Sequence, residues 1–210
     1  MKKIIFMLAA FVLCFQIAAI SQTRVGISGG VAVANMKGKV NGDSRSGVMT
    51  GLVLETPLGK SFTFRPTLSY VQKGQNQPSP GLVDKLYIAL RYAEFNADFL
   101  YYIGGVKSSV FIGAGPSVDF NLPSKKVSET AGVKSVSTIN FGKVLLKDMR
   151  GVDFGANFTA GWRSKSGLFI SLNYNKGLRN LVIENDPGSL KNQYFGAQLG
   201  FFLNNGKAAK

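Results

Sequence analysis

The feature that most constrains the fold of this 210-residue chain is a period-two alternation of apolar and polar side chains. The alternation is clearest over residues 61–70, 152–163 and 168–175, where every second side chain is apolar. Because successive side chains of a β-strand point to opposite faces, this spacing gives each strand one apolar and one polar face. The sequence therefore predicts an all-β fold.

Five weaker stretches with the same spacing complete a set of eight predicted strands. Each is close to the length of about 9–11 residues that a tilted strand needs to cross a bilayer. The eight predicted strands are residues 25–36, 48–55, 61–70, 91–101, 109–120, 152–163, 168–175 and 193–203.

The connections between these strands alternate between short and long. Turn-forming residues make three short connections, at 57–60, 104–107 and 164–167. The other connections are long and polar, over residues 37–46, 73–85, 121–150 and 177–192. Bacterial outer-membrane barrels have turns at one rim and loops at the other. The chain is therefore predicted to form an eight-stranded antiparallel up-and-down transmembrane β-barrel, with both termini at the turn rim in the periplasm.

The polar faces of the strands favour a membrane barrel over a soluble sandwich, in which apolar faces would pack together and polar faces would meet water. These faces carry Gly, Ser, Thr and Asn with isolated charges of both signs, and Lys is nearly absent from the predicted strand interiors. Such a mixture suits a narrow lumen in which charges pair. The predicted lumen charges are Glu55, Arg65, Glu94, Asp98, Asp153 and Arg163.

Aromatic residues gather near the ends of the predicted strands, which is typical of the girdles that flank the apolar band of a membrane barrel. The ordinary preference of aromatic residues for strands is the alternative explanation. The residues concerned are Tyr70, Tyr101, Tyr102, Trp162, Tyr174, Tyr194, Phe201 and Phe202.

The N-terminus has the three parts of a secretory signal peptide. Lys2 and Lys3 precede an apolar stretch over residues 4–15, and small residues lead up to Ser21. We expect cleavage after Ser21, which leaves a barrel domain over residues 22–210. An uncleaved membrane anchor is the alternative, and the shortness of the apolar stretch argues against it.

The expected mature chain contains no histidine, and the single cysteine, Cys14, lies in the signal peptide. This composition excludes disulfides, imidazole catalysis and Cys/His metal sites. Glu94 and Asp98 are four residues apart on one strand face, or roughly 13 Å, which is too far for a catalytic carboxylate pair. We expect them to pair with Arg65 or Arg163 instead. No catalytic residue, cofactor or metal site is predicted.

The formal charge of +14 first suggests a nucleic-acid partner, but the signal peptide argues for anionic lipid instead. Segment 121–150 carries several basic residues that are candidates for contact with the phosphates of lipopolysaccharide, although a purely solvated loop is the alternative. The basic residues are Lys125, Lys126, Lys134, Lys143, Lys147 and Arg150.

Several stretches resemble the small Gram-negative outer-membrane β-barrels grouped as PorT-like or "porin family" proteins. They are residues 25–31, Asn35-Met36, and residues 51–60, 64–74, 113–116, 167–169 and 174–178. The resemblance implies an eight-stranded barrel in the outer membrane and says little about activity. Eight strands leave an interior about filled by side chains, so bulk diffusion through the barrel is not expected. We expect a structural, adhesion or surface-binding role, with an unidentified extracellular ligand or envelope protein as a further partner. The alternatives are a narrow channel for small solutes or ions and a soluble exported ligand-binding barrel.

Overall fold

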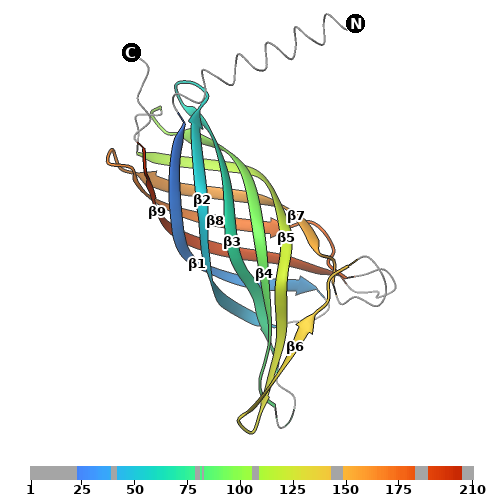
Figure 1. Ribbon diagram of the computed structural model, residues 1–210. Coiled ribbons are helices and arrows are strands. Elements are labelled where there is room, and N and C mark those ends of the chain that lie inside the picture. Colours follow the sequence, from blue (N-terminus) through green and yellow to red (C-terminus); the bar gives the residue numbers. More distant parts are fainter. Residues whose placement is uncertain are drawn as a thin grey trace, which may run out of the picture.

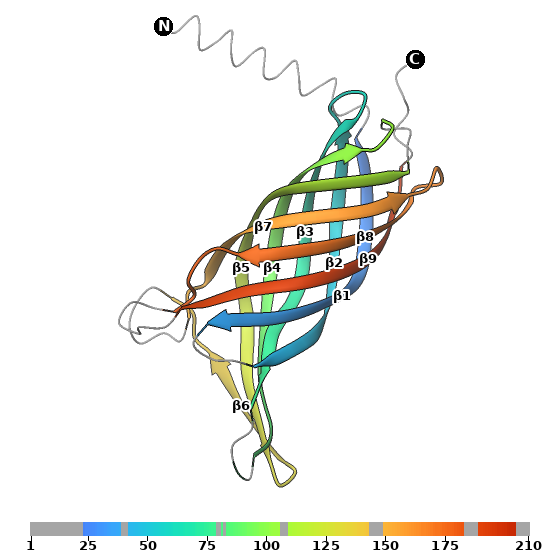
Figure 2. The same ribbon diagram turned by 180° about the vertical axis from the view of Figure 1, so that it is seen from behind.

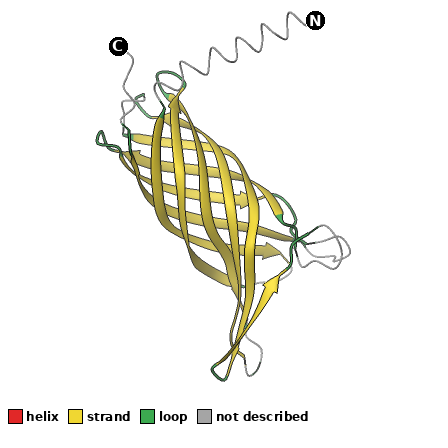
Figure 3. Ribbon diagram, in the orientation of Figure 1, coloured by secondary structure: helices red, strands yellow, loops and turns green. Residues whose placement is uncertain are grey.

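The computed structural model describes residues 23–38, 42–78, 81, 83–105, 109–142, 149–182 and 189–204. The predicted signal peptide, including Cys14, lies outside the described residues. Strands make up most of the described chain (Figure 3). They are β1 (Arg24–Gly38), β2 (Asp43–Pro57), β3 (Phe62–Gln77), β4 (Val83–Tyr102), β5 (Val110–Thr130), β6 (Val133–Ile139), β7 (Val152–Arg163), β8 (Leu168–Gly177) and β9 (Leu190–Phe202).

Eight of these strands form a closed antiparallel ring in the order β1-β2-β3-β4-β5-β7-β8-β9. The ring closes where β1 pairs with β9 along nearly its whole length, from Gly26↔Phe202 to Gly38↔Leu190. Figures 1 and 2 show the two sides of the resulting barrel, with strongly tilted strands. The predicted eight-stranded antiparallel barrel is confirmed.

Strand β6 lies outside the ring and pairs only with β5. The two strands meet at a tight turn in which Ala131 and Gly132 both have positive φ, 50° and 79°. This hairpin projects beyond the barrel together with the ends of β3 and β4 (Figure 1). The prediction of one long loop over residues 121–150 is therefore wrong, because residues 121–130 continue β5 and residues 133–139 form β6.

The other predicted long loops are also shortened by strand extensions. Strand β3 continues to Gln77 and β4 starts at Val83, so most of the predicted loop 73–85 is paired backbone. These extensions are polar and lack the apolar alternation, which is why the sequence pattern placed them in loops. The two ends of the barrel, called here the short-turn end and the long-connection end, therefore differ mainly in how far the strands extend.

Most of the large apolar side chains in the membrane part of the ring point outward. Leu52, Phe99 and Ile112 are each more than half exposed, and they come from β2, β4 and β5. Polar side chains such as Ser69, Asn96 and Asn157 are buried inside. A sandwich would bury its apolar faces, so this arrangement identifies a barrel with an apolar outer surface. No helix in the described part of the chain is long and apolar enough to span a membrane.

The aromatic residues near strand ends divide between the two faces. Tyr101, Trp162 and Phe201 point outward, as a girdle requires, and Tyr70 and Tyr174 are half-buried. Three others point into the barrel and are at most 1% exposed, so the girdle prediction was wrong for Tyr102, Tyr194 and Phe202. Their position in the alternation, rather than their aromatic character, decides which face they occupy.

Candidate functional site

The barrel interior holds a group of buried charged side chains. All six predicted lumen charges are buried inside the ring, at most 8% exposed. Two further buried ionic groups, Lys73 and Asp119, lie there as well. Six of these eight groups belong to two ion-paired clusters, and the other two, Asp98 and Asp153, lie beside them.

The Glu55 cluster lies toward the short-turn end and consists of Glu55, Arg24, Arg65, Arg163 and Tyr102. The Glu55 carboxylate accepts hydrogen bonds from Arg65 Nε at 3.1 Å and Nη2 at 2.5 Å, and from Arg24 Nη1 at 2.8 Å. Arg163 Nη1 donates to the same carboxylate, and the Tyr102 hydroxyl donates to it at 3.1–3.2 Å. One carboxylate thus neutralises part of the charge of three arginines from β1, β3 and β7.

Aromatic rings complete this cluster. The Arg65 guanidinium lies 4.2 Å from the Phe111 ring centre and 5.4 Å from that of Phe169, and Arg163 lies 4.5 Å from the Tyr102 ring. Each is within the range of a cation–π contact. The rings stabilise the positive charge that a single carboxylate leaves over, and all three are buried in the barrel interior.

The Lys73 cluster lies toward the long-connection end and consists of Lys73, Glu94, Asp119, Tyr92 and Tyr194. Lys73 Nζ is 2.7 Å from Glu94 Oε2 and 2.6 Å from Asp119 Oδ2. The Tyr194 hydroxyl donates to Glu94 Oε1 at 2.5 Å. The rings of Tyr92 and Tyr194 lie 5.2 and 4.8 Å from the ammonium group. Here one cation holds two carboxylates.

The position of Lys73 corrects two expectations. Lys73 lies in β3 rather than in a loop, and it, not Arg65 or Arg163, binds Glu94. Alternation could have revealed this, because Arg65 and Lys73 share the inward-facing row of β3. Alternation on β5 could likewise have revealed Asp119, which the sequence prediction missed. Asp119 lies in register with Glu94 on β4 and with Asp153 on β7.

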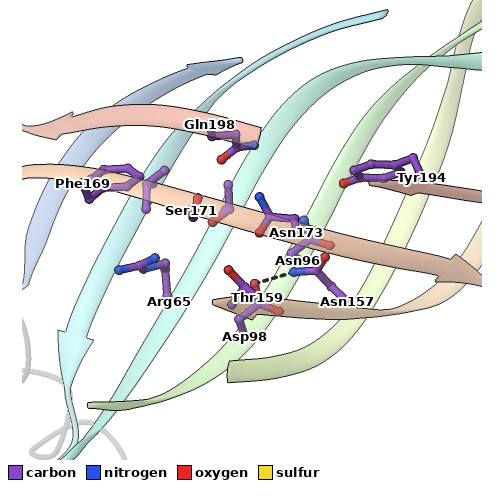
Figure 4. A pocket seen from close by; sticks show the side chains of 12 residues that line it. Arg65, Asn96, Asp98, Asn157, Thr159, Phe169, Ser171, Asn173, Tyr194 and Gln198 are labelled. Atoms are coloured by element: carbon purple, nitrogen blue, oxygen red, sulfur yellow. Dashed lines mark hydrogen bonds between the residues drawn. The ribbon is translucent and has the colours of Figure 1, made fainter. Parts of the chain in front are cut away.

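The remaining predicted lumen carboxylates have neutral partners. Asp98 Oδ2 accepts a hydrogen bond from Asn157 Nδ2 at 2.8 Å (Figure 4), and Asp153 Oδ1 accepts one from the backbone amide of Phe154 at 2.8 Å. Between the two clusters, a polar cavity of only about 20 Å³ is lined by Arg65, Asp98, Asn157 and their neighbours. A space of this size holds about one water molecule.

An apolar cap closes the long-connection end of the lumen. It consists of buried side chains from the ring, from β6, from the β6–β7 connection and from the β8–β9 connection, which are Met36, Leu90, Tyr92, Ile139, Met149 and Leu181. The Arg150 amide donates to the Leu181 carbonyl at 3.0 Å, and the Leu181 amide donates to the Leu190 carbonyl at 2.8 Å. The first bond joins the β6–β7 connection to the β8–β9 connection, and the second joins the β8–β9 connection to β9.

The residues of the predicted basic segment lie on different elements of the structure. Lys125 and Lys126 lie on β5 and Lys134 on β6, whereas Lys143 and Lys147 lie outside the described residues. Arg150 Nε donates to the Val182 carbonyl at 3.1 Å and so helps to hold the connections together. Within the described chain, no three acidic side chains are placed to hold a metal ion.

A closed antiparallel ring with an apolar outer face and a charge-paired polar interior defines the class of integral membrane β-barrels. The sequence places the chain within that class. It belongs to the family described as the outer membrane protein beta-barrel domain, whose pattern matches residues 17–182. No curated protein sequence matches the chain.

Solved structures similar to this chain include three bacterial proteins. Neisserial surface protein A is 13% identical, over 84% of this chain and 96% of its own, with a TM-score of 0.46. Ail, the attachment invasion locus protein of Yersinia pestis, is 10% identical, over 86% and 99%, with a TM-score of 0.47. The N-terminal barrel domain of Pseudomonas aeruginosa OprF is 11% identical, over 83% and 97%, with a TM-score of 0.31.

Proposed function

We propose that this outer-membrane barrel has a structural, adhesion or surface-binding role and no catalytic activity. The observation that carries the proposal is the filled interior. The Glu55 cluster, the polar cavity of about 20 Å³, the Lys73 cluster and the apolar cap follow one another along the barrel. An eight-stranded barrel has an interior about filled by side chains. Because side chains occupy the lumen, the surfaces available for binding are the two ends of the barrel and its lipid-facing wall.

Conductance in planar bilayers tests this proposal against the alternative of a narrow channel. We expect the refolded mature protein to insert without discrete, reproducible current steps. A porin of known conductance, added to the same bilayer, controls for insertion. Reproducible unitary steps that scale with the amount of protein would overturn the closed-barrel proposal in favour of a channel.

Two features of the chain support the absence of catalysis. The 210 residues include no histidine, so the usual base of a serine hydrolase is missing. The buried carboxylates Glu55, Glu94 and Asp119 are each held by a cation at 2.8 Å or less, which commits them to charge pairing.

We propose further that a signal peptide is removed after Ser21 and that the termini lie in the periplasm. The support is the pattern over residues 1–21 and the shortness of the turns at the short-turn end, as outer-membrane barrels have on the periplasmic side. The motifs over residues 51–60 and 64–74 likewise support membership of the PorT-like subgroup. N-terminal sequencing of the membrane-extracted protein should begin at Gln22, and a start at Met1 would contradict cleavage.

Cysteine labelling in intact cells tests the orientation, because the expected mature chain has no cysteine of its own. Val133→Cys lies in the projecting hairpin and should react with a membrane-impermeant maleimide. Leu58→Cys lies in a short turn and should react only after the outer membrane is permeabilised. The reverse pattern would contradict the proposed orientation.

A further inference from the structure

We propose that a basic groove on the outer wall of the barrel, at the long-connection end, binds the phosphate groups of the lipopolysaccharide glycolipid in the outer leaflet. The basic groove has a volume of about 230 Å³ and is formed by β2 to β6. The inference rests on the proposed orientation, in which this end faces the outside. It names a site and a ligand class for the proposed surface role.

The charge of the groove is entirely of one sign. Four of its lining residues are basic and none is acidic; the full lining is Arg45, Gln72, Tyr87, Ala89, Leu90, Arg91, Lys125, Val127, Lys134 and Val136. Within the described chain, none of the four basic residues forms an ion pair. By contrast, Arg65, Lys73 and Arg163 in the lumen all have carboxylate partners. The cations of the groove are therefore available to an external anion.

The height of the groove on the barrel wall matches the headgroup layer. Tyr70 and Ala93 lie in register on β3 and β4 and end the apolar part of their outward-facing rows, and the apolar row of β5 ends at Leu122, in register with Arg91. The next outward residue on β4 is Arg91, two residues or roughly 7 Å further along the strand. Lys125 lies in register with Ala89, one step beyond. The cations thus begin where the apolar band ends.

The residue at this boundary has the geometry expected at a membrane interface. The Tyr70 hydroxyl accepts a hydrogen bond from Gln72 Nε2 at 3.0 Å, so the ring lies against the apolar band and its polar tip meets the groove. A phosphate attached to a lipid anchored in the bilayer would meet the groove at this level. A soluble anion gains nothing from that position.

The groove also holds its cations in place. The Arg45 guanidinium lies 4.6 Å from the Tyr87 ring centre, which restricts its position. Val127 is buried in the wall, and it pairs in register with both Tyr87 and Val136. The acidic neighbour Glu129 is 3.9 Å from Lys85, which does not line the groove. Two guanidinium and two ammonium groups around an apolar floor suit phosphate oxygens, which Arg binds in a bidentate manner.

The test compares two lipids with the same acyl chains, bisphosphorylated lipid A and its dephosphorylated form. Binding to the mature protein in detergent micelles is measured by titration. We expect tighter binding of the phosphorylated lipid, weakened by added salt. Arg91→Gln and Lys125→Gln should each weaken it about fivefold and the double variant about 25-fold, at about 1 kcal/mol per cation near a charged membrane surface.

Lys126→Gln is the matched control, because Lys126 is the exposed neighbour of Lys125 and does not line the groove. Its affinity for lipid A should stay within about twofold of wild type. Equal binding of the two lipids would overturn the proposal, as would an equal loss in Lys126→Gln and Lys125→Gln. Pyrophosphate that binds as tightly as lipid A would overturn the lipid assignment. Micelles expose both barrel ends, so a wrong orientation would be seen only in cysteine labelling.

Discussion

At the scale of single residues, the interior is organised around a few groups that each hold several partners. Glu55 accepts hydrogen bonds from three arginines and a tyrosine, and Lys73 binds two carboxylates. Removing one partner of a buried ion pair leaves an uncompensated charge, which is more costly than the pair is stabilising. These two residues are therefore the most sensitive points of the lumen.

Replacing Glu55 with glutamine should lower the free energy of unfolding by about 3 kcal/mol or more, because buried arginines lose their shared counter-charge. Urea titration of the protein in lipid vesicles measures the change, with the fluorescence of the single tryptophan, Trp162, as the probe. Glu129→Gln is the control, since Glu129 pairs with a largely exposed Lys85 at 3.9 Å and should cost less than about 1 kcal/mol. Equal losses in the two variants would contradict a central role for Glu55.

The pair formed by Lys73 and Asp119 should show strong coupling in a double-mutant cycle. Lys73→Met leaves Glu94 and Asp119 buried without their cation, whereas adding Asp119→Asn removes one of the two orphaned charges. We expect the loss of stability in the double variant to be smaller than the sum of the losses in the two single variants, by about 1 kcal/mol or more. The same urea titration measures all three variants, and additive losses would show that the ion pair contributes nothing specific.

At the scale of elements, each long strand has a membrane part and an extension. The outward row of β4 is apolar from Tyr101 to Ala93, and Arg91 begins the extension. Strand β6 is wholly an extension, because it pairs only with β5 outside the ring. An exposed apolar residue should therefore tolerate replacement by a charged residue in an extension but not in the membrane part of a strand.

Lysine substitutions at Leu52 and Val133 test this division. Both side chains are exposed, 57% and 72%, but Leu52 lies on the ring between Ile27 and Leu68, and Val133 lies on β6. Leu52→Lys should cost about 2–4 kcal/mol of folding free energy in vesicles, as for a lipid-facing lysine near the bilayer midplane. Val133→Lys should stay within about 0.5 kcal/mol of wild type, as surface changes usually do. If Val133→Lys also cost about 2–4 kcal/mol of folding free energy, β6 would have to lie in lipid.

At the scale of the whole molecule, ring closure leaves each of the eight ring strands paired along both edges. Closure satisfies the backbone hydrogen bonds that lipid cannot satisfy, and it removes the free edges that would otherwise promote aggregation. The charge clusters and the cap depend on this closure, because their members come from strands on opposite sides of the ring.

A closed barrel should migrate differently on a detergent gel before and after boiling, because the paired ring resists unfolding by the detergent at room temperature. Deleting residues 190–204 removes β9, which joins β8 to β1, and should abolish the difference. Deleting residues 129–134 shortens the β5–β6 hairpin and the β4 pairing at Val83 and Lys85, all in the extensions, and should preserve the difference. A wild-type band that boiling does not shift would contradict ring closure.

Much of the fold could be predicted from the sequence because alternation is a local property of the chain. The spacing over residues 152–163 coincides with β7, and all six predicted lumen charges lie on inward-facing rows. The prediction was wrong where the alternation of apolar and polar residues is lost. The polar stretch from Lys73 to Gln77 carries no apolar face, yet its backbone continues to pair with β4.

The sequence by itself therefore determined the membrane parts of the ring strands and the two faces of each, since both follow from a two-residue repeat. Only the tertiary structure decided which inward-facing groups meet. Glu55 and Arg163 are 108 residues apart and share a hydrogen bond, and Lys73 rather than Arg65 binds Glu94. The physical reason is the stagger of strands around the closed ring. The stagger sets the height of every inward-facing residue along the barrel axis, and that height cannot be derived from the local spacing of residues in the sequence.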